Sequence, residues 1–137
     1  MRRDRRRAQK GIVSTNLKFE IHDSNSASQP YYWKIIGRNG YDTLAKSETL
    51  TSKDHALRMA QLLKDSALSL KFEVFRSNSG SQPWSWRVEA ANNVIVVSAS
   101  ETYANQSGAQ AAADSVKYYA SSAEIIDKTR SAVSSRW

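Results

Sequence analysis

The stretch SNSASQPYYWK at residues 24–34 returns later in the chain as SNSGSQPWSWR at residues 77–87. Both copies have the same order: a half rich in Ser, Asn, Gln and Pro, an aromatic residue, one variable position, and a tryptophan. Such a repeat is either one binding motif used twice or one structural unit that has been duplicated. The extent of the match on either side decides between these two interpretations.

The match continues in both directions at a constant spacing of 53 residues, without a gap from residue 17 to residue 120. LKFE at 17–20 recurs at 70–73, and SET at 47–49 recurs at 100–102. Identical residues at this spacing include the pairs Trp33 and Trp86, Asn39 and Asn92, Ala56 and Ala109, Ala60 and Ala113, and Lys64 and Lys117. A duplicated unit explains a match of this length better than a short motif does.

The pattern of apolar residues predicts three strands and a helix in the first copy. Residues 17–22 alternate apolar and polar, as a half-buried strand does, and residues 31–36 alternate in the same way. Asn39-Gly40 predicts a type I′ turn before a third strand at roughly 41–49. A helix follows, because Thr51 and Asp54 have capping-box spacing and because apolar residues then recur at helical spacing, at Ala56, Leu57, Ala60 and Leu63.

The second copy repeats this order, and the segment SALSL at 66–70 joins the copies without Gly or Pro. We therefore predict an α+β fold built from a tandem β-β-β-α repeat, over residues 17–67 and 68–120. Two three-stranded antiparallel sheets are expected to join about a pseudo-two-fold axis, with the helices packed on one face. Ser121 and Glu124 have the spacing of another capping box and predict an extra C-terminal helix over 121–137.

Positive charge is concentrated at the N-terminus. The first ten residues hold six basic side chains against Asp4, a net charge of +5, whereas residues 17–120 hold eleven basic and ten acidic side chains. The net charge of +7 therefore comes from a basic arm at 1–16 and not from a basic face. Guanidinium groups bind phosphates by charge and bidentate hydrogen bonds. The candidate nucleic-acid-binding residues are Arg2, Arg3, Arg5, Arg6, Arg7 and Lys10, and a solubilising tail is the alternative interpretation.

Composition excludes several classes of site. The chain has no cysteine, which rules out disulfides, thiolate zinc sites and a cysteine nucleophile, and which fits a cytoplasmic location. No apolar run is long enough to span a membrane, and the N-terminus lacks the apolar stretch of a secretory signal. His22 and His55 have no third ligand nearby in the sequence, and no phosphate loop or nucleophile elbow is present. We predict no metal, no cofactor and no catalytic residue.

Taken together, LKFEI, YYWKI, RNG, LAKSET and TSKDHAL in the first copy, with LKFEV, WSWRV, ANN and VSASETY in the second, resemble the YegP-like family. The resemblance covers residues 17–120 and neither end of the chain. It implies an α+β fold in which two units pair about a pseudo-two-fold axis, within one chain in tandem members. It implies no catalytic residues. Asn92-Asn93 stands where the family favours Asn-Gly, which predicts a looser turn in the second copy.

The tryptophans and their neighbours suggest two faces. Trp33 and Trp86 could stack on nucleobases, but they alternate with polar residues as core positions do, and we interpret them as core. On the opposite face, Tyr32 and Ile36 of the first copy replace polar residues of the second, where Phe75 is the apolar exception. These three residues form the candidate partner surface; cover by the C-terminal helix is the alternative.

These observations predict a monomeric, non-enzymatic binding or assembly protein. In the first hypothesis the Arg-rich arm contacts RNA, DNA or a ribonucleoprotein assembly. In the second, the protein is a protein–protein interaction module, such as an inhibitor or a stress-related factor, without direct contact to nucleic acid. The two hypotheses differ in which surface carries the function, the arm or the apolar side chains of the sheet.

Overall fold

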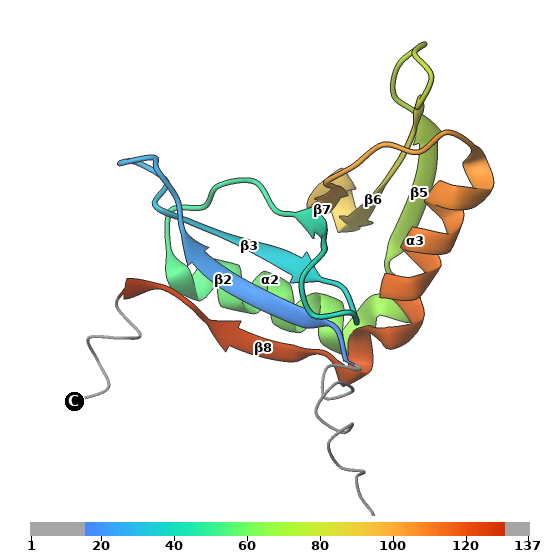
Figure 1. Ribbon diagram of the computed structural model, residues 1–137. Helices are drawn as coiled ribbons and strands as arrows, with labels where there is room; N and C mark the ends of the chain where they lie inside the picture. Colours follow the sequence, from blue (N-terminus) through green and yellow to red (C-terminus); the bar gives the residue numbers. More distant parts are fainter. Residues whose placement is uncertain (1–15, 131–137) are drawn as a thin grey trace, which may run out of the picture.

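The computed structural model describes residues 16–130, which form one seven-stranded mixed sheet and two α-helices (Figure 1). The strand order in the sheet is β5-β6-β7-β4-β3-β2-β8. The strands are β2 (Lys18–Asp23), β3 (Tyr31–Ile36), β4 (Thr43–Lys46), β5 (Lys71–Arg76), β6 (Trp84–Ala90), β7 (Val94–Ala99) and β8 (Glu124–Asp127), and the helices are α2 (Lys53–Ser66) and α3 (Gln106–Tyr119). The α+β fold class is confirmed, and three strands followed by a helix occur twice along the chain.

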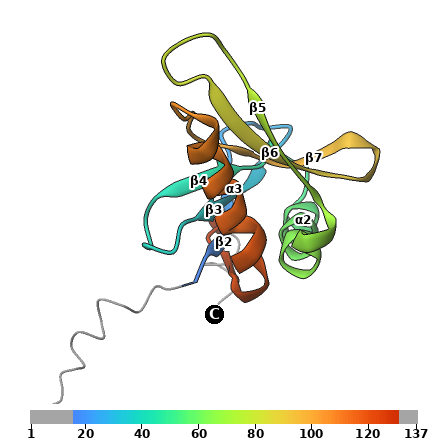
Figure 2. The ribbon, with the colours of Figure 1, turned by 90° about the vertical axis from the view of Figure 1, so that its right-hand side faces the viewer.

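The two predicted three-stranded sheets form a single sheet, because β4 and β7 join the two halves. They pair antiparallel through Ala45 with Ala99 and Lys46 with Ser98. This junction is only two residue pairs long, and the strands of the two halves run in steeply different directions (Figures 1 and 2). Pairing at this point satisfies backbone groups that two separate sheets would each leave at a free edge.

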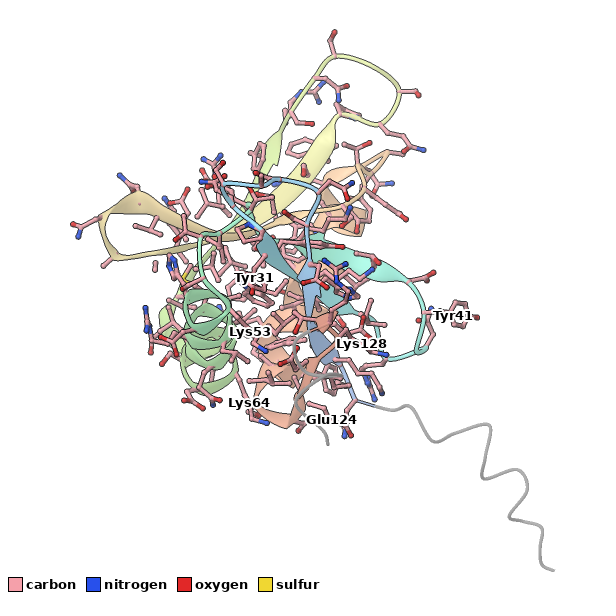
Figure 3. The ribbon with its side chains drawn as sticks, turned by 90° about the vertical axis from the view of Figure 1, so that its left-hand side faces the viewer. Tyr31, Tyr41, Lys53, Lys64, Glu124 and Lys128 are labelled. Atoms are coloured by element: carbon pink, nitrogen blue, oxygen red, sulfur yellow. The ribbon has the colours of Figure 1, made fainter. Side chains whose placement is uncertain are left out.

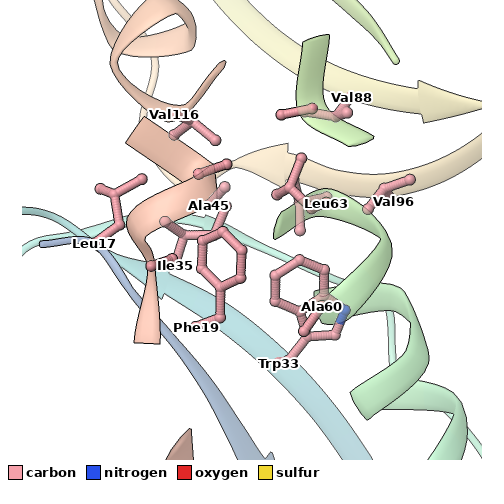
Figure 4. Packing of buried hydrophobic residues seen from close by; sticks show 14 of the residues in the cluster. Leu17, Phe19, Trp33, Ile35, Ala45, Ala60, Leu63, Val88, Val96 and Val116 are labelled. Atoms are coloured by element: carbon pink, nitrogen blue, oxygen red, sulfur yellow. The ribbon is translucent and has the colours of Figure 1, made fainter. Parts of the chain in front are cut away.

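Both helices pack against the sheet and share one hydrophobic core. α2 lies on β2 and β3, while α3 lies on β5 and β6. Trp33 and Trp86 are fully buried in this core, which confirms their interpretation as core residues. The ring of Trp33 lies 5.4 Å from that of Phe19, close to Ala60 and Leu63 of α2 (Figure 4). Their burial removes these two tryptophans as stacking partners for a ligand.

The N-terminus of α2 is capped one residue later than the sequence predicts. Ser52, not Thr51, is the N-cap of α2, and its side chain accepts a hydrogen bond from the backbone N–H of His55. Asn105 caps α3 in the same way, by accepting from the N–H of Gly108. Each cap satisfies a backbone donor that the first helical turn leaves without an internal acceptor.

The predicted C-terminal helix is wrong where the structure describes it, because residues 124–127 form β8. This strand pairs parallel to β2, with Phe19 opposite Ile125, and it runs along the edge of the sheet (Figure 1). A short apolar run such as Ile125-Ile126 does not distinguish strand from helix by periodicity. The free edge of β2 decides the outcome, since β8 supplies partners for its backbone groups. Residues 131–137 lie outside the described range.

The type I′ turn is found in the second copy and not at Asn39-Gly40. In the first copy, the N–H of Gly40 bonds to the carbonyl of Gly37, and only Gly40 has a positive φ, 93°. In the second copy, Asn92 and Asn93 have φ of 64° and 61°, and the N–H of Val94 bonds to the carbonyl of Ala91. Positive φ at both central residues defines this tight turn, so the expected looser turn is wrong.

Replacing Asn92 with alanine should therefore destabilise the protein by about 1–2 kcal/mol, because a Cβ without a compensating side-chain group disfavours the left-handed conformation. Asn92→Gly is the matched control and should leave stability within about 0.5 kcal/mol, since glycine adopts positive φ freely. Urea denaturation followed by circular dichroism measures both. Equal losses in the two variants would contradict the role of backbone conformation.

The third strand of the second copy is displaced by one residue relative to the sequence repeat. Lys34 pairs with Lys46 in the first copy, whereas Arg87, which is 53 residues after Lys34, pairs with Ser98. Both hairpins contain an irregularity next to this point, between Ile35 and Ile36 and at the matching position 53 residues later. The displacement brings Lys46 opposite Ser98 where β4 meets β7. It thereby determines which side chains meet at the centre of the sheet.

Candidate functional site

A row of polar side chains crosses the sheet on the face opposite the helices. Residues that are paired in neighbouring strands point to the same side of a sheet, so the row follows from the strand register. Its members alternate with the core residues of their own strands, and we call the side on which they lie the open face. In sheet order from β2 to β5 the row consists of Glu20, Lys34, Lys46, Ser98, Arg87 and Glu73.

Two lysines at the centre of this row are unpaired. Lys34 and Lys46 face each other across β3 and β4, and neither forms an ion pair or hydrogen bond with another described residue. Arg87, by contrast, is bound by Glu73 at 2.9 Å and by Glu89 at 2.8 Å. Like charges directly opposite each other destabilise a strand pair. The centre of the sheet therefore holds two lysines without an ion-pair partner among the described residues.

Glu20 faces Lys34 but forms no ion pair with it. It is opposite Lys34 in the pairing of β2 with β3, but its carboxylate lies 2.9 Å from Nε2 of His22. The ring of His22 in turn stacks on Tyr32, with centroids 5.5 Å apart and planes inclined by 20°. Glu20, His22 and Tyr32 thus form a short chain of contacts that fixes the tyrosine ring next to the lysines.

A hollow of about 480 Å³ lies beside Tyr32 and Lys46. This volume is within the range of small-molecule sites. Hydrogen bonds hold its hydroxyl groups in place: Thr49 donates to the side chain of Gln29 at 2.7 Å, and Ser47 accepts from the N–H of Trp33 at 2.9 Å. The lining residues are Asp23, Ser24, Asn25, Tyr32, Lys46, Ser47 and Thr49. The wall of the hollow is therefore polar and held by internal bonds, with one aromatic ring and one unpaired cation.

The second copy of the repeat lacks the groups that characterise this hollow. Ser85 stands at the position of Tyr32, and Ser98 takes the place of Lys46 in the strand register. Arg76 stands at the position of Asp23. Only the first copy therefore combines Tyr32 with lysines that have no ion-pair partner among the described residues. The sequence could have indicated it through Tyr32 and Lys34, which alternate on one face, but Lys46 joins them only through the register.

The predicted partner surface does not form one patch. Tyr32 lines the hollow, but Ile36 is only 5% exposed, so the prediction that it lies on an accessible face is wrong. Phe75 is half-buried beneath the guanidinium group of Arg87, 4.7 Å from the ring centroid. Three strands separate β3 from β5 in the sheet, so Tyr32 and Phe75 are far apart. The six candidate residues of the basic arm lie outside the described residues.

A second group of polar contacts anchors β8 to α2. Lys53 Nζ lies 2.8 Å from a carboxylate oxygen of Asp127, whose other oxygen accepts from the backbone N–H and hydroxyl of Thr129. Farther along α2, Lys64 donates to the carbonyl of Ala123; Figure 3 shows both lysines on this side of the molecule. Burial raises the pKa of Asp127, but the hydrogen bonds and the charge of Lys53 outweigh burial and hold it below its usual value. The contacts of Lys53, Lys64, Asp127 and Thr129 thus hold the β8 segment to α2.

The described residues offer no metal centre. Among residues 16–130, no three His, Asp or Glu side chains lie together in a way that could hold a metal ion. His22 is bound to Glu20, and His55 lies in the first turn of α2. No helix in this part of the chain has the length and apolar character required to cross a membrane. The hollow beside Tyr32 offers charge, hydrogen-bonding groups and one aromatic ring.

Comparison with known proteins confirms the predicted resemblance to the YegP-like family. Residues 81–127 match the model of a family described as Domain of unknown function (DUF1508), a range that runs from β6 through β8. Among curated proteins, none matches the chain. Two solution structures share the fold. One is yegP from E. coli, described as a protein of unknown function, with a TM-score of 0.68 and 22% identity over 86% of this chain and 97% of that one.

The other similar structure is a UPF0339 protein from Shewanella oneidensis, with a TM-score of 0.65 and 19% identity. The match covers 83% of this chain and 92% of the Shewanella chain. At these identities the likeness concerns the fold. The comparisons assign no activity to any of the three chains, so a functional proposal has to be argued from the residues.

Proposed function

We propose that this protein is a non-enzymatic binding or assembly protein whose basic arm contacts nucleic acid, either free or within a ribonucleoprotein assembly. The observation that supports the proposal is the separation of charge along the chain. The arm has a net charge of +5 over its first ten residues, whereas residues 16–130 hold thirteen basic and twelve acidic side chains. A compact body that is nearly neutral leaves the arm as the strongest attraction for phosphates.

The body is suited to the role of a scaffold. We propose that its two copies form an internal pseudo-dimer, and that one chain is therefore sufficient as a monomer. In support, β4 and β7 pair antiparallel with Lys46 opposite Ser98, which are equivalent positions in the strand register. A two-fold axis produces this kind of pairing, in which the same element meets itself. The cysteine-free composition is in keeping with a cytoplasmic location, which belongs to the same proposal.

The test of the arm is the salt dependence of nucleic-acid binding. If five arginines neutralise about five phosphates, the logarithm of affinity for a duplex should fall with the logarithm of salt concentration with a slope of roughly −4 to −5. Full-length protein in which Arg2, Arg3, Arg5, Arg6 and Arg7 are all replaced with Gln should lose most of this slope. Fluorescence anisotropy with a labelled duplex and a labelled single strand measures both proteins.

A matched control removes positive charge from the body. Lys71→Gln and Arg58→Gln alter exposed basic residues of β5 and α2 and should change the slope by less than about 1. Binding and slope that survive replacement of all five arginines would refute the role of the arm. The alternative function, a protein–protein interaction module without nucleic-acid contact, predicts that nuclease treatment does not reduce partner capture and that purified nucleic acid does not bind.

A further inference from the structure

We propose that the open face binds one nucleotide unit of a single-stranded nucleic acid, with the base stacked on Tyr32 and the phosphate between Lys34 and Lys46. This inference rests on the proposed function for its class of ligand, but not on the arm for its site. The observation that supports it is the position of two lysines, which form no ion pair with a described residue, next to a polar hollow lined by one aromatic ring.

The charge of the site selects an anionic ligand. Two ammonium groups that face each other without an ion pair among the described residues repel, and a phosphate placed between them would offset this repulsion. The carboxylate of Glu20 faces Lys34 from β2 but is hydrogen-bonded to His22. The neighbouring cation, Arg87, is already held by two carboxylates and is not available in the same way. Lys46 lines the hollow itself, so an anion that reaches it also reaches the polar wall.

The aromatic ring and the polar side chains that line the hollow favour an aromatic ligand that can form hydrogen bonds. The ring of Tyr32 stacks on that of His22 and lines the hollow. Nucleobases stack on such rings in single-strand binding proteins, independently of base identity. Asn25 offers an amide, and Ser24, Ser47 and Thr49 add hydroxyl groups at the same wall. Charge, ring and polar edges within one hollow match the three parts of a nucleotide.

The second copy provides an internal comparison. In the second copy, Ser85 replaces the tyrosine, and the ring on that face, Phe75, lies beneath the guanidinium group of Arg87, which two carboxylates bind. A purely architectural role for the open face would place the same demands on both copies. The copies differ at Tyr32 and Lys46, the side chains that a nucleotide would contact most directly, and also at Asp23. The first two differences point to a ligand bound by the first copy alone.

The experiment is a nuclear magnetic resonance titration of full-length protein with a short oligouridine, uridine monophosphate, uridine and inorganic phosphate. We expect the oligouridine to shift the backbone amides of Tyr32, Lys34 and Lys46, and the monophosphate to shift them more weakly. At about 50 mM salt, Tyr32→Ser should weaken oligouridine binding at this site about 5- to 100-fold. Lys46→Gln should weaken it about tenfold and reduce the salt slope by about 0.7. Lys71→Gln, on β5 of the same face, should have neither effect.

Position-resolved shifts separate this inference from the proposed function. Shifts confined to residues 1–10 would refute the open-face site and support nucleic-acid binding by the arm. Shifts confined to the open face would support the open-face site and refute binding by the arm. Absence of shifts in both regions would overturn both proposals. Equal shifts with inorganic phosphate and oligouridine, unaffected by Tyr32→Ser, would reduce the site to an anion site and refute base stacking. Lys46→Gln should not lower the urea midpoint, because it removes a repulsion, and a lower midpoint would show a structural role instead.

Discussion

Trp33→Ala is expected to lower the free energy of unfolding by about 3–5 kcal/mol, a large share of the roughly 5–15 kcal/mol that a domain has in total. The indole is fully buried, packs on Phe19, and faces Ala60 and Leu63 of α2, so its removal leaves a cavity between sheet and helix (Figure 4). Trp86, its counterpart in the second copy, is equally buried and should respond alike. Urea denaturation followed by far-ultraviolet circular dichroism measures the loss.

Two further substitutions test the explanation. Trp84 is only half-buried, so Trp84→Ala should cost clearly less than Trp33→Ala. Trp33→Phe should cost less than about 2 kcal/mol, because the indole N–H has no hydrogen-bond partner among the described residues, and its removal offsets part of the lost packing. Similar losses for Trp33→Ala and Trp84→Ala would contradict the core position of Trp33.

The second large effect concerns Asp127 and pH. Asp127→Asn should destabilise the protein by about 1–2 kcal/mol at pH 7, because it weakens charge-assisted hydrogen bonds to Lys53 and Thr129 that hold β8 to α2. The folded-state pKa of Asp127 lies below its unfolded value, so the ionised carboxylate stabilises the fold above the unfolded pKa. This contribution disappears as the pH falls from that value through the folded-state pKa.

The variant should therefore approach the wild type in stability as the medium becomes acidic. Denaturation measured at a series of pH values from about 7 to 3 follows the difference, which should shrink below the ordinary aspartate pKa of about 3.9. Asp114→Asn is the matched control: this carboxylate is exposed on α3 and bonds only to Gln110 among the described residues, so the change should stay within about 0.5 kcal/mol. A difference that is constant with pH would show that ionisation of Asp127 is irrelevant.

For the candidate site, sequence reasoning found one residue of three. The alternation of β3 identified Tyr32 as outward-facing, and the comparison of the two copies marked it as unusual. Ile36 shares that alternation but is buried, because alternation assigns a side to a residue without stating what covers that side. Lys34 and Lys46 indicate a candidate anion site only when they are seen to face each other across β3 and β4. Their pairing depends on the register of the β3–β4 hairpin, whose irregularity between Ile35 and Ile36 has no local sequence signal.

The sequence by itself determined the element order of the two copies, the burial of Trp33 and Trp86, and the concentration of charge in the arm. These properties are local or periodic, so they can be read from spacing and composition. Only the tertiary structure decided that the halves form one sheet and that Ile125-Ile126 becomes a strand. Each of these outcomes depends on which backbone edge is left without hydrogen-bond partners once the rest has folded. That demand arises between segments far apart in the chain, and no single segment encodes it.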